Sequence, residues 1–451
     1  MLSCIYLSSA AALSGQLARG AQPYAQVEKP AVAMNNAALL LLWIGSVSGD
    51  YYAIPERATC TTAQRQQIKK HGVPFNKFSN CPKLNWVDWF ATERECGVKQ
   101  AHILVIGGNK GFDCVGWLRM YRNTNATDDW KPSAKEWLSV LPASTTCGQC
   151  KQCESEYPLP KRRKLSELPP TVTCVEPLPA NFDGLSAAAQ TEPWASSGLR
   201  IIHAAAALDT SRKVTFPANA KWGREDIGID NHGQNRLQNP SGEISVATKT
   251  VDQLVFGDAG SNEQPKIPTV LTIDTEGFDA LVLFGAARTL SSGGVAYLEF
   301  EYHGMPPWKD IKLKWIIDYL NNFHFDCYFA GNDGLAFKVT GCWQEKYEFH
   351  KWSNLACASR MKIEPHTCWH DAIEHFSAVD GCFNGDPRSL PPQSRGNVVL
   401  CSDSAESSEK SNGGTTVTRA STETPQEGTQ SDANQNAAGS PRQFLGLKSS
   451  H

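Results

Sequence analysis

Short apolar runs alternate with amphipathic stretches of helical length from about residue 101 to residue 340. This alternation is typical of βαβ units arranged around a parallel sheet. The apolar runs predict strands at residues 103–106, 171–175, 199–204, 269–274 and 295–300, with a final pair at 327–329 and 335–339. The stretches between them predict helices at 112–122, 180–189, 278–290 and 312–323. We therefore expect a doubly wound, Rossmann-like α/β fold over residues 101–340.

Segments of other composition flank and interrupt this predicted domain. Residues 50–100 contain Cys and Trp but no recognisable motif, and they predict a cap of loops and short helices. Gly111 and Glu176 are 65 positions apart, which is far more than such a connection needs, so residues 120–168 are interpreted as an insertion. Residues 341–384 form a Cys-rich extension. Residues 385–451 predict a disordered tail, because residues 402–443 contain no aromatic side chain to bury.

Most of the 15 cysteines lie outside the predicted core. This distribution is typical of disulfide-linked flanking segments in an oxidising compartment, and we expect several disulfides within residues 60–96 and 342–382. The odd total leaves at least one cysteine unpaired within the monomer, with Cys4 and Cys401 as candidates. The sequon that begins at Asn125 is then expected to carry a glycan.

The first 49 residues have features of a targeting segment. The apolar run 37–47 is shorter than the roughly 20 residues that span a bilayer, and it fits a secretory signal that starts at Met34. We expect a Golgi-lumenal or secreted protein, with membrane contact only through this signal or anchor. The Ser- and Ala-rich stretch before the run keeps an organelle or the cytoplasm as alternatives. The net charge of −3 gives no reason to expect a nucleic-acid partner.

The first predicted strand ends in a glycine-rich turn, VIGGNKG at residues 105–111, that leads directly into a helix pattern. Glycines let the main chain turn sharply and approach a ligand closely at the carboxyl end of a sheet. The second predicted strand ends in Glu176, where a carboxylate can accept both hydrogen bonds of a ribose diol. Together the two features predict a nucleotide-type site, although each alone also fits an ordinary turn or a solvated loop residue.

Two carboxylates follow the apolar strand at residues 269–274. The sequence VLTIDTEGFD, residues 270–279, places Asp274 and Glu276 at the end of a predicted strand. An amphipathic helical pattern follows directly. Such a pair can bind a substrate or act as a base, although one member can also cap the following helix. Further candidate bases are Glu299, Glu301 and His303, which we expect at the end of the next strand.

In this order, the motifs resemble the FkbM family of S-adenosylmethionine-dependent methyltransferases. The resemblance rests on the glycine turn at 105–111, Glu-Pro at 176–177, the segment 246–252, the IDTEG motif at 273–277 with the following Leu, Gly and Ala, and Leu-Glu at 298–299. Two positions differ from the family pattern. Val105 stands where the family usually has an acidic residue, and Gly108 stands where it has Ala.

The resemblance implies a class I methyltransferase fold and S-adenosylmethionine as cofactor. By this resemblance, the methionine end of the cofactor contacts the glycine turn, through Gly107, Gly108, Asn109 and Gly111, and Glu176 holds the ribose. Asp274 and Glu276 are the favoured catalytic residues, with His303 as a further candidate and no metal assigned. Together with the secretory features, the family implies O-methylation of a hydroxyl on a sugar or glycan.

Alternative hypotheses stay open at this point. A glycine turn followed by a strand-end Glu also suits a nicotinamide-dependent oxidoreductase, although the G-x-G-x-x-G spacing is missing. A catalytically silent binding protein on the same fold is a second alternative, with Val105 as the sign of a lost cofactor site. The CGQCKQC run at 147–153 can begin a zinc site, although disulfides fit it better. The basic cluster 161–164 is typical of a solvated loop, but it also resembles a nuclear import or phosphate-binding patch.

Overall fold

The computed structural model describes residues 60, 81–93, 96–122, 130–148, 150, 153, 165–210, 213–218, 220–224, 242–258, 264–331, 334–379, 382–383 and 399–400. The predicted targeting segment, the sequon at Asn125 and the basic cluster 161–164 lie outside these residues. So does the predicted tail, apart from residues 399–400, which form a short strand.

The centre of the fold is a sheet whose described strands run in the order β14-β13-β12-β10-β9-β11-β8-β7-β1-β2-β3. Its largest parallel part consists of β1 (His102–Ile106), β2 (Thr171–Glu176), β3 (Leu199–His203), β7 (Val270–Ile273) and β8 (Tyr297–Tyr302). The remaining strands are β9 (Phe325–Ala330), β10 (Ala336–Lys338), β11 (Ser353–Ser359), β12 (Ser377–Val379), β13 (Cys382–Phe383) and β14 (Val399–Leu400). The predicted Rossmann-like α/β fold is confirmed.

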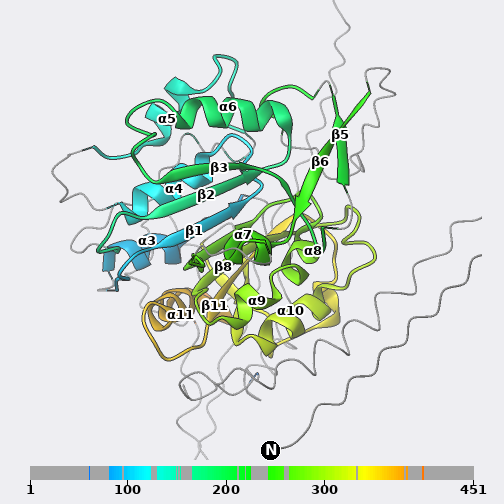
Figure 1. Cartoon of the computed structure of the whole chain (residues 1–451). Helices are drawn as coiled ribbons and strands as arrows, with labels where there is room; N and C mark the ends of the chain where they lie inside the picture. The colour runs from blue at the N-terminus through cyan, green and yellow to red at the C-terminus, as the bar shows by residue number, and fades with distance from the viewer. Residues whose placement is uncertain are drawn as a thin grey trace, which may run out of the picture. The chain divides into compact units, whose positions relative to one another are not determined.

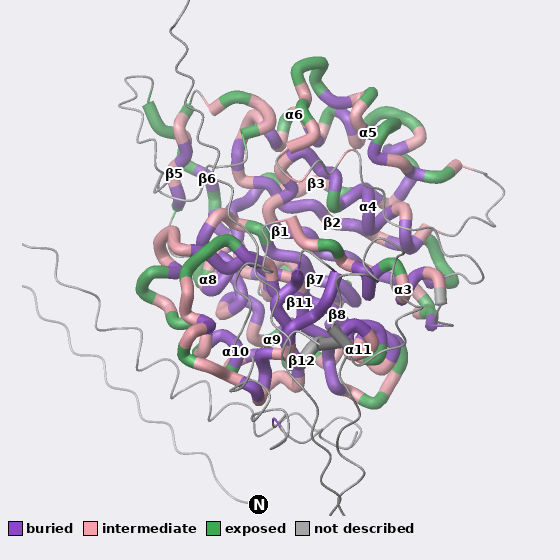
Figure 2. The backbone as a smooth tube through the Cα atoms, turned by 180° about the vertical axis from the view of Figure 1, so that it is seen from behind, coloured by how far each residue is buried: buried purple, intermediate pink, exposed green. Residues whose placement is uncertain are grey.

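Helices cover this sheet on both faces (Figure 1). They are α3 (Asn85–Glu93), α4 (Phe112–Tyr121), α5 (Ala134–Val140), α6 (Pro179–Ala189), α7 (Val251–Phe256), α8 (Asp279–Phe284), α9 (Ala287–Ser291), α10 (Leu313–Asn322) and α11 (His366–His375). Aromatic rings join α3, α4 and α11, since Trp369 stacks on Phe90 and meets Trp117 edge to face. Burial is continuous along the central strands (Figure 2), so the sheet forms the core.

The sheet does not end at residue 340, where we expected the domain to end. Strand β11 lies between β8 and β9 and is antiparallel to both. Its sequence, SNLACAS, consists mostly of small residues, so it lacks the strong apolar signal of the other strands, although six of its seven residues are buried. The Cys-rich extension therefore supplies a central strand of the sheet.

The helix expected at 278–290 is divided into α8 and α9, and Asp252 explains the division. Its carboxylate accepts hydrogen bonds from the main-chain amides of Arg288 and Thr289, at 2.9 and 2.7 Å, at the start of α9. A Cβ on Gly285 would overlap with the carbonyl oxygen of Ala207, so this position accommodates only glycine. Tertiary contacts thus override the uninterrupted helical pattern.

Two elements were not expected from the sequence. The insertion contains α5, whose first turn is capped by the Ser133 hydroxyl. A separate small sheet, of order β4-β6-β5, is made by β4 (Ala205–Ala206), β5 (Lys213–Pro217) and β6 (Glu243–Lys249). Both elements border the candidate site described below.

Twelve of the cysteines form six disulfides. The pairs are Cys60–Cys342, Cys81–Cys150, Cys96–Cys368, Cys114–Cys174, Cys147–Cys153 and Cys327–Cys357. Our expectation of pairing within the segments 60–96 and 342–382 is wrong in its connectivity, because two of these bonds join one segment to the other. The zinc hypothesis for 147–153 also fails, since all three sulfurs of the run are in disulfides. The pairing is compatible with an oxidising compartment.

We expect the purified protein to show these six linkages in peptide mapping under non-reducing conditions. The most informative peptides are those that join Cys60 to Cys342 and Cys96 to Cys368, because they test whether the two flanking segments are held together. The same digest after reduction and alkylation is the control. Free thiols at these four positions would contradict the pairing and favour a reducing compartment.

None of the helices in the described residues combines the length and the apolar character that crossing a bilayer requires.

Candidate active site

The glycine turn is fixed between the ends of β2 and β7. The amides of Gly107 and Gly108 both donate to the carbonyl of Val175, each at 2.9 Å. Gly107 has φ 88°, in the left-handed region, and a Cβ there would overlap with the carbonyl oxygen of Asp274. Glycine at this position therefore allows the turn to lie directly against the end of β7.

Glycine is required at position 108 for a different steric reason. A Cβ at this position would lie 2.7 Å from the sulfur of Cys174, which is bonded to Cys114 on α4. The FkbM pattern has Ala here, so the absent methyl group makes room for the disulfide under the turn. Val105, the other departure from the pattern, lies buried inside β1.

Glu176 ends β2 with its carboxylate held by the main chain. One oxygen accepts from the Asn109 amide at 2.6 Å and the other from the Leu178 amide at 2.8 Å. Burial raises the pKa of Glu176 to about 7, although these hydrogen bonds and one from Asn181 oppose that effect. The carboxylate is thus fixed in place and close to its protonation midpoint at neutral pH.

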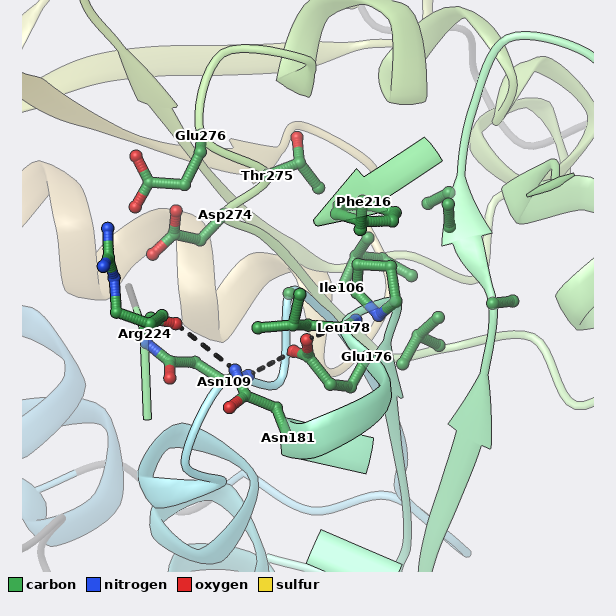
Figure 3. Close-up of a pocket in the computed structure, with 16 residues that line it drawn as sticks. Ile106, Asn109, Glu176, Leu178, Asn181, Phe216, Arg224, Asp274, Thr275 and Glu276 are labelled. Carbon is green, nitrogen blue, oxygen red and sulfur yellow. Dashed lines mark hydrogen bonds between the residues drawn. The ribbon is translucent and has the colours of Figure 1, made fainter. Parts of the chain in front are cut away.

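A pocket opens beside these groups at the carboxyl end of the sheet (Figure 3). Its lining brings together groups from separate parts of the chain: Gly107, Asn109, Glu176, Asn181, Phe216, Arg224, Asp274 and Glu276 are among them. The side-chain oxygen of Asn109 is buried and has no hydrogen-bond partner within the described structure. It is therefore an acceptor that a ligand can use.

The insertion covers the outer side of the glycine turn. The indole of Trp137 on α5 donates to the carbonyl of Lys110 at 2.7 Å. A Cβ on Gly111 would lie 3.0 Å from the same ring and 2.8 Å from Leu185. Gly111 therefore does not line the pocket but allows close packing of the turn against α5 and α6. The insertion supports the site from outside.

Asp274 and Glu276 both line the pocket, as their place after β7 predicts. The Asp274 amide donates to the carbonyl of Ile106 at 2.9 Å, which joins the ends of β7 and β1. Glu276 has φ 52°, an unusual conformation for a non-glycine residue. Figure 3 shows the Arg224 side chain extending toward both carboxylates. The helix that follows has Phe278 at its N-cap, so neither carboxylate occupies that position.

Asp279 was not singled out from the sequence, yet it is a buried link between strands β7 and β8. Its carboxylate accepts from the Thr275 hydroxyl and from the Glu301 amide, each at 3.2 Å. Burial, reinforced by the nearby charge of Asp274, raises the pKa of Asp279 to about 7. This side chain positions the Thr275 turn against the end of β8.

Glu301 and His303 lie beside Glu276, with ligand atoms of all three within 4.8 Å of one another. His303 is fully buried, and burial lowers its pKa to about 4, so the ring is neutral. Its Nδ1 accepts from the Met305 amide at 3.1 Å. The ring proton is therefore on Nε2, which faces a Glu301 oxygen at 3.6 Å. Burial and the charges of Asp274, Glu276 and Asp279 raise the pKa of Glu301.

Glu299 is not at a strand end, contrary to expectation, because β8 continues to Tyr302. Its carboxylate hydrogen-bonds the Tyr297 hydroxyl. Burial raises the pKa of Glu299 to about 7, with a smaller contribution from the charge of Asp113 on α4. It does not line the pocket.

Two groups in the described part of the chain have a spacing that could hold a metal ion. In the first, Glu276 with Glu301 and His303, the proton on His303 Nε2 blocks the nitrogen that would bind the ion. In the second, Asp326 is paired with Arg360 and Lys338, at 2.7 and 3.2 Å. Burial acts to raise the pKa of Asp326, but a hydrogen bond from His370 and the charges of these cations hold it at about 2. The second group is therefore a buried ion-pair network.

The parallel sheet, the glycine turn and the buried strand-end Glu define a Rossmann-like α/β fold. Within this chain, residues 147–327 match the family model described as the methyltransferase FkbM domain. This match confirms the FkbM resemblance and supports a methyltransferase that uses a methyl donor. The glycine turn precedes the matched residues, and the structure places it against them.

One solved structure is similar to this chain, the crystal structure of a methyltransferase FkbM from Methylobacillus flagellatus KT. The sequence identity is 12% and the TM-score is 0.30. The similarity covers 61% of this chain and 48% of that chain, so this chain spans about half the length of the solved protein. No curated protein matches the sequence.

Proposed function

We propose that the protein uses S-adenosylmethionine to methylate a hydroxyl oxygen on a sugar or glycan. The observation that carries the proposal is the Glu176 carboxylate, which the amides of Asn109 and Leu178 hold in a pocket beside the glycine turn. Two fixed carboxylate oxygens suit the two hydroxyls of a ribose. The family match supports the methyl-transfer part of the proposal.

The residues present fit this cofactor. Glu176 would hold its ribose, and Gly107 and Asn109 would line its methionine end. Gly108 packs against Cys174 and is not among the residues that line the pocket. The unpartnered side-chain oxygen of Asn109 suits the amino group found there. When bound, S-adenosylmethionine supplies a methyl group on a positively charged sulfur. Gly111 contributes indirectly, by letting Trp137 pack against the turn.

Asp274 and Glu276 would bind the acceptor, because they line the same pocket on the side away from Glu176 (Figure 3). A carboxylate there can orient a hydroxyl group and accept its proton as the oxygen attacks. Glu301 lies beside Glu276, and His303 Nε2 faces a Glu301 oxygen at 3.6 Å, beyond hydrogen-bond distance. His303 is thus placed to position the carboxylates, because its Nδ1 is engaged by Met305.

The decisive experiment incubates the purified full chain with methyl-labelled S-adenosylmethionine and a panel of glycans, lipids and small phenols. We expect label in the glycan fraction, in a form stable to base, as a methyl ether is. Label in another fraction would reject the sugar acceptor. A folded protein that binds no S-adenosylmethionine would instead support the silent binding protein.

Glu176→Ala is expected to weaken S-adenosylmethionine binding by about 1.5–3 kcal/mol, since it removes hydrogen bonds to a charged group. Isothermal titration calorimetry measures this as a loss of roughly 10- to 150-fold in affinity. Glu243→Ala, which removes an exposed carboxylate outside the pocket, is the matched control. Unchanged affinity in a folded Glu176→Ala variant would remove Glu176 from the ribose site.

The affinity for S-adenosylmethionine should also rise with pH. Ribose hydroxyls donate to the ionised form of Glu176, whose pKa is about 7, so the ionised fraction is about ten times larger at pH 8 than at pH 6. The increase should level off above pH 8. Glu176→Gln should lack this dependence, and an affinity that falls with rising pH would reject the assignment.

A further inference from the structure

Trp352 is a large aromatic residue that the structure leaves 43% exposed. It lies just before β11, beyond the residues that match the family model. One face of the ring is stacked on His303, with ring centroids 4.8 Å apart and an interplanar angle of 18°. Because His303 is fully buried, the exposed area of the indole belongs to its opposite face and edge.

Contacts join this ring to the candidate acceptor site. The Trp352 ring stacks on His303, whose Nε2 lies 3.6 Å from a Glu301 oxygen. Glu301 in turn lies within 4.8 Å of Glu276, measured between their ligand atoms. Glu276 lines the pocket that also contains Glu176. A continuous row of groups therefore leads from the proposed cofactor site to an exposed aromatic face.

The segment that carries Trp352 is anchored to the end of β8. The His350 amide donates to the Tyr302 hydroxyl at 3.2 Å, and the Ser353 hydroxyl donates to the Tyr302 carbonyl at the same distance. The imidazole ring of His303 also packs against one face of the indole. Trp352 is thus fixed before any ligand arrives, which reduces the entropy lost on binding.

An exposed indole beside carboxylates matches the two sides of a sugar ring. A pyranose has an apolar face of C–H groups that packs on an aromatic ring, and hydroxyls at its edge that donate to carboxylates. The carboxylates also disfavour an anionic ligand through charge repulsion. A neutral sugar satisfies both features of the surface.

We propose that Trp352 is the acceptor platform, on which a neutral pyranose stacks with one hydroxyl directed toward Glu276 and Asp274. This inference rests on the proposed function and narrows its acceptor to a sugar ring bound through its apolar face. Trp352 is a specificity residue supplied by the segment that follows the family match.

The test uses saturation-transfer NMR on the full chain, with the methyl glycosides of glucose, galactose and mannose as probes. At least one glycoside should receive saturation at its C–H protons from the wild-type protein. Trp352→Ala should weaken that binding by about tenfold or more, while Trp352→Phe should retain most of it. Trp315→Ala is the matched control, because Trp315 is 49% exposed but lies on α10 and is not among the residues that line the pocket.

A separate titration with S-adenosylmethionine distinguishes this proposal from the proposed function. Trp352→Ala should bind the cofactor as the wild type does, and its KM for the acceptor should rise more than its kcat falls. Absence of cofactor binding in the wild type would reject the methyl-transfer function, whereas Trp352-dependent glycoside binding would still support the platform. The platform is overturned if no glycoside binds, if binding survives Trp352→Ala, or if tetramethylammonium binds in place of the sugars.

Discussion

Asp274→Asn and Glu276→Gln should each lower the rate of methyl transfer by about 10²–10⁴-fold, the usual contribution of a general base. Both substitutions keep the shape of the side chain and remove its charge, so an effect of this size would report chemistry and not folding. The cofactor affinity should change little, because neither carboxylate holds Glu176 or the glycine turn. A labelled-methyl assay under single-turnover conditions measures the chemical step directly.

The matched control for this pair is Asp318→Asn, which removes an exposed carboxylate on α10 that pairs with Lys314. It should leave the rate unchanged. Full activity in both Asp274→Asn and Glu276→Gln would disprove their catalytic assignment. Glu301 would then be the next candidate, since it lies in the same group of carboxylates.

Gly107→Ala should destabilise the fold by more than about 3 kcal/mol, because it combines two unfavourable effects. The left-handed φ alone costs about 1–2 kcal/mol for a residue with a Cβ. The new methyl group would also overlap with the carbonyl oxygen of Asp274, which is main chain and cannot rotate away. Separating the ends of β1 and β7 should abolish cofactor binding in any protein that still folds.

Gly242→Ala separates these two effects. Gly242 has φ 91°, but a Cβ there would have nothing within 4 Å, so it should cost only the backbone strain. Urea denaturation of both variants measures the difference in the free energy of unfolding. Equal stability of Gly107→Ala and Gly242→Ala would show that the turn is not pressed against β7 as described.

The sequence predicted the parallel half of the sheet well, because β1 and β7 are buried along nearly their whole length and read as mostly apolar runs. Such runs also fix where their ends lie, so Glu176, Asp274 and Glu276 were placed at the same edge of the sheet. The pocket shared by these residues follows from that arrangement.

Other features depend on contacts that a local pattern does not contain. The packing of β11 between two strands depends on small side chains, and the break between α8 and α9 depends on Asp252, which is far away in the sequence. Trp352 is placed by β11, which begins at the next residue. Because β11 was not predicted, Trp352 could not be linked to the site from the sequence. Arg224 and Asp279 were missed for a related reason, because single charged residues in a loop or helix give no periodic signal.

The position of β11 has a consequence for how this chain acquires its structure during synthesis. Strand β9 is synthesised before β11. In the finished sheet, β11 lies between β9 and β8 and joins them. Until residue 359 has been made, two edges of the sheet stay unpaired and open to pairing with other chains. A chain cut after residue 327, where the family match ends, would lose half of β9 and would leave the edge of β8 permanently unpaired. We expect such a fragment to aggregate, so the smallest unit that folds must extend beyond the recognisable domain.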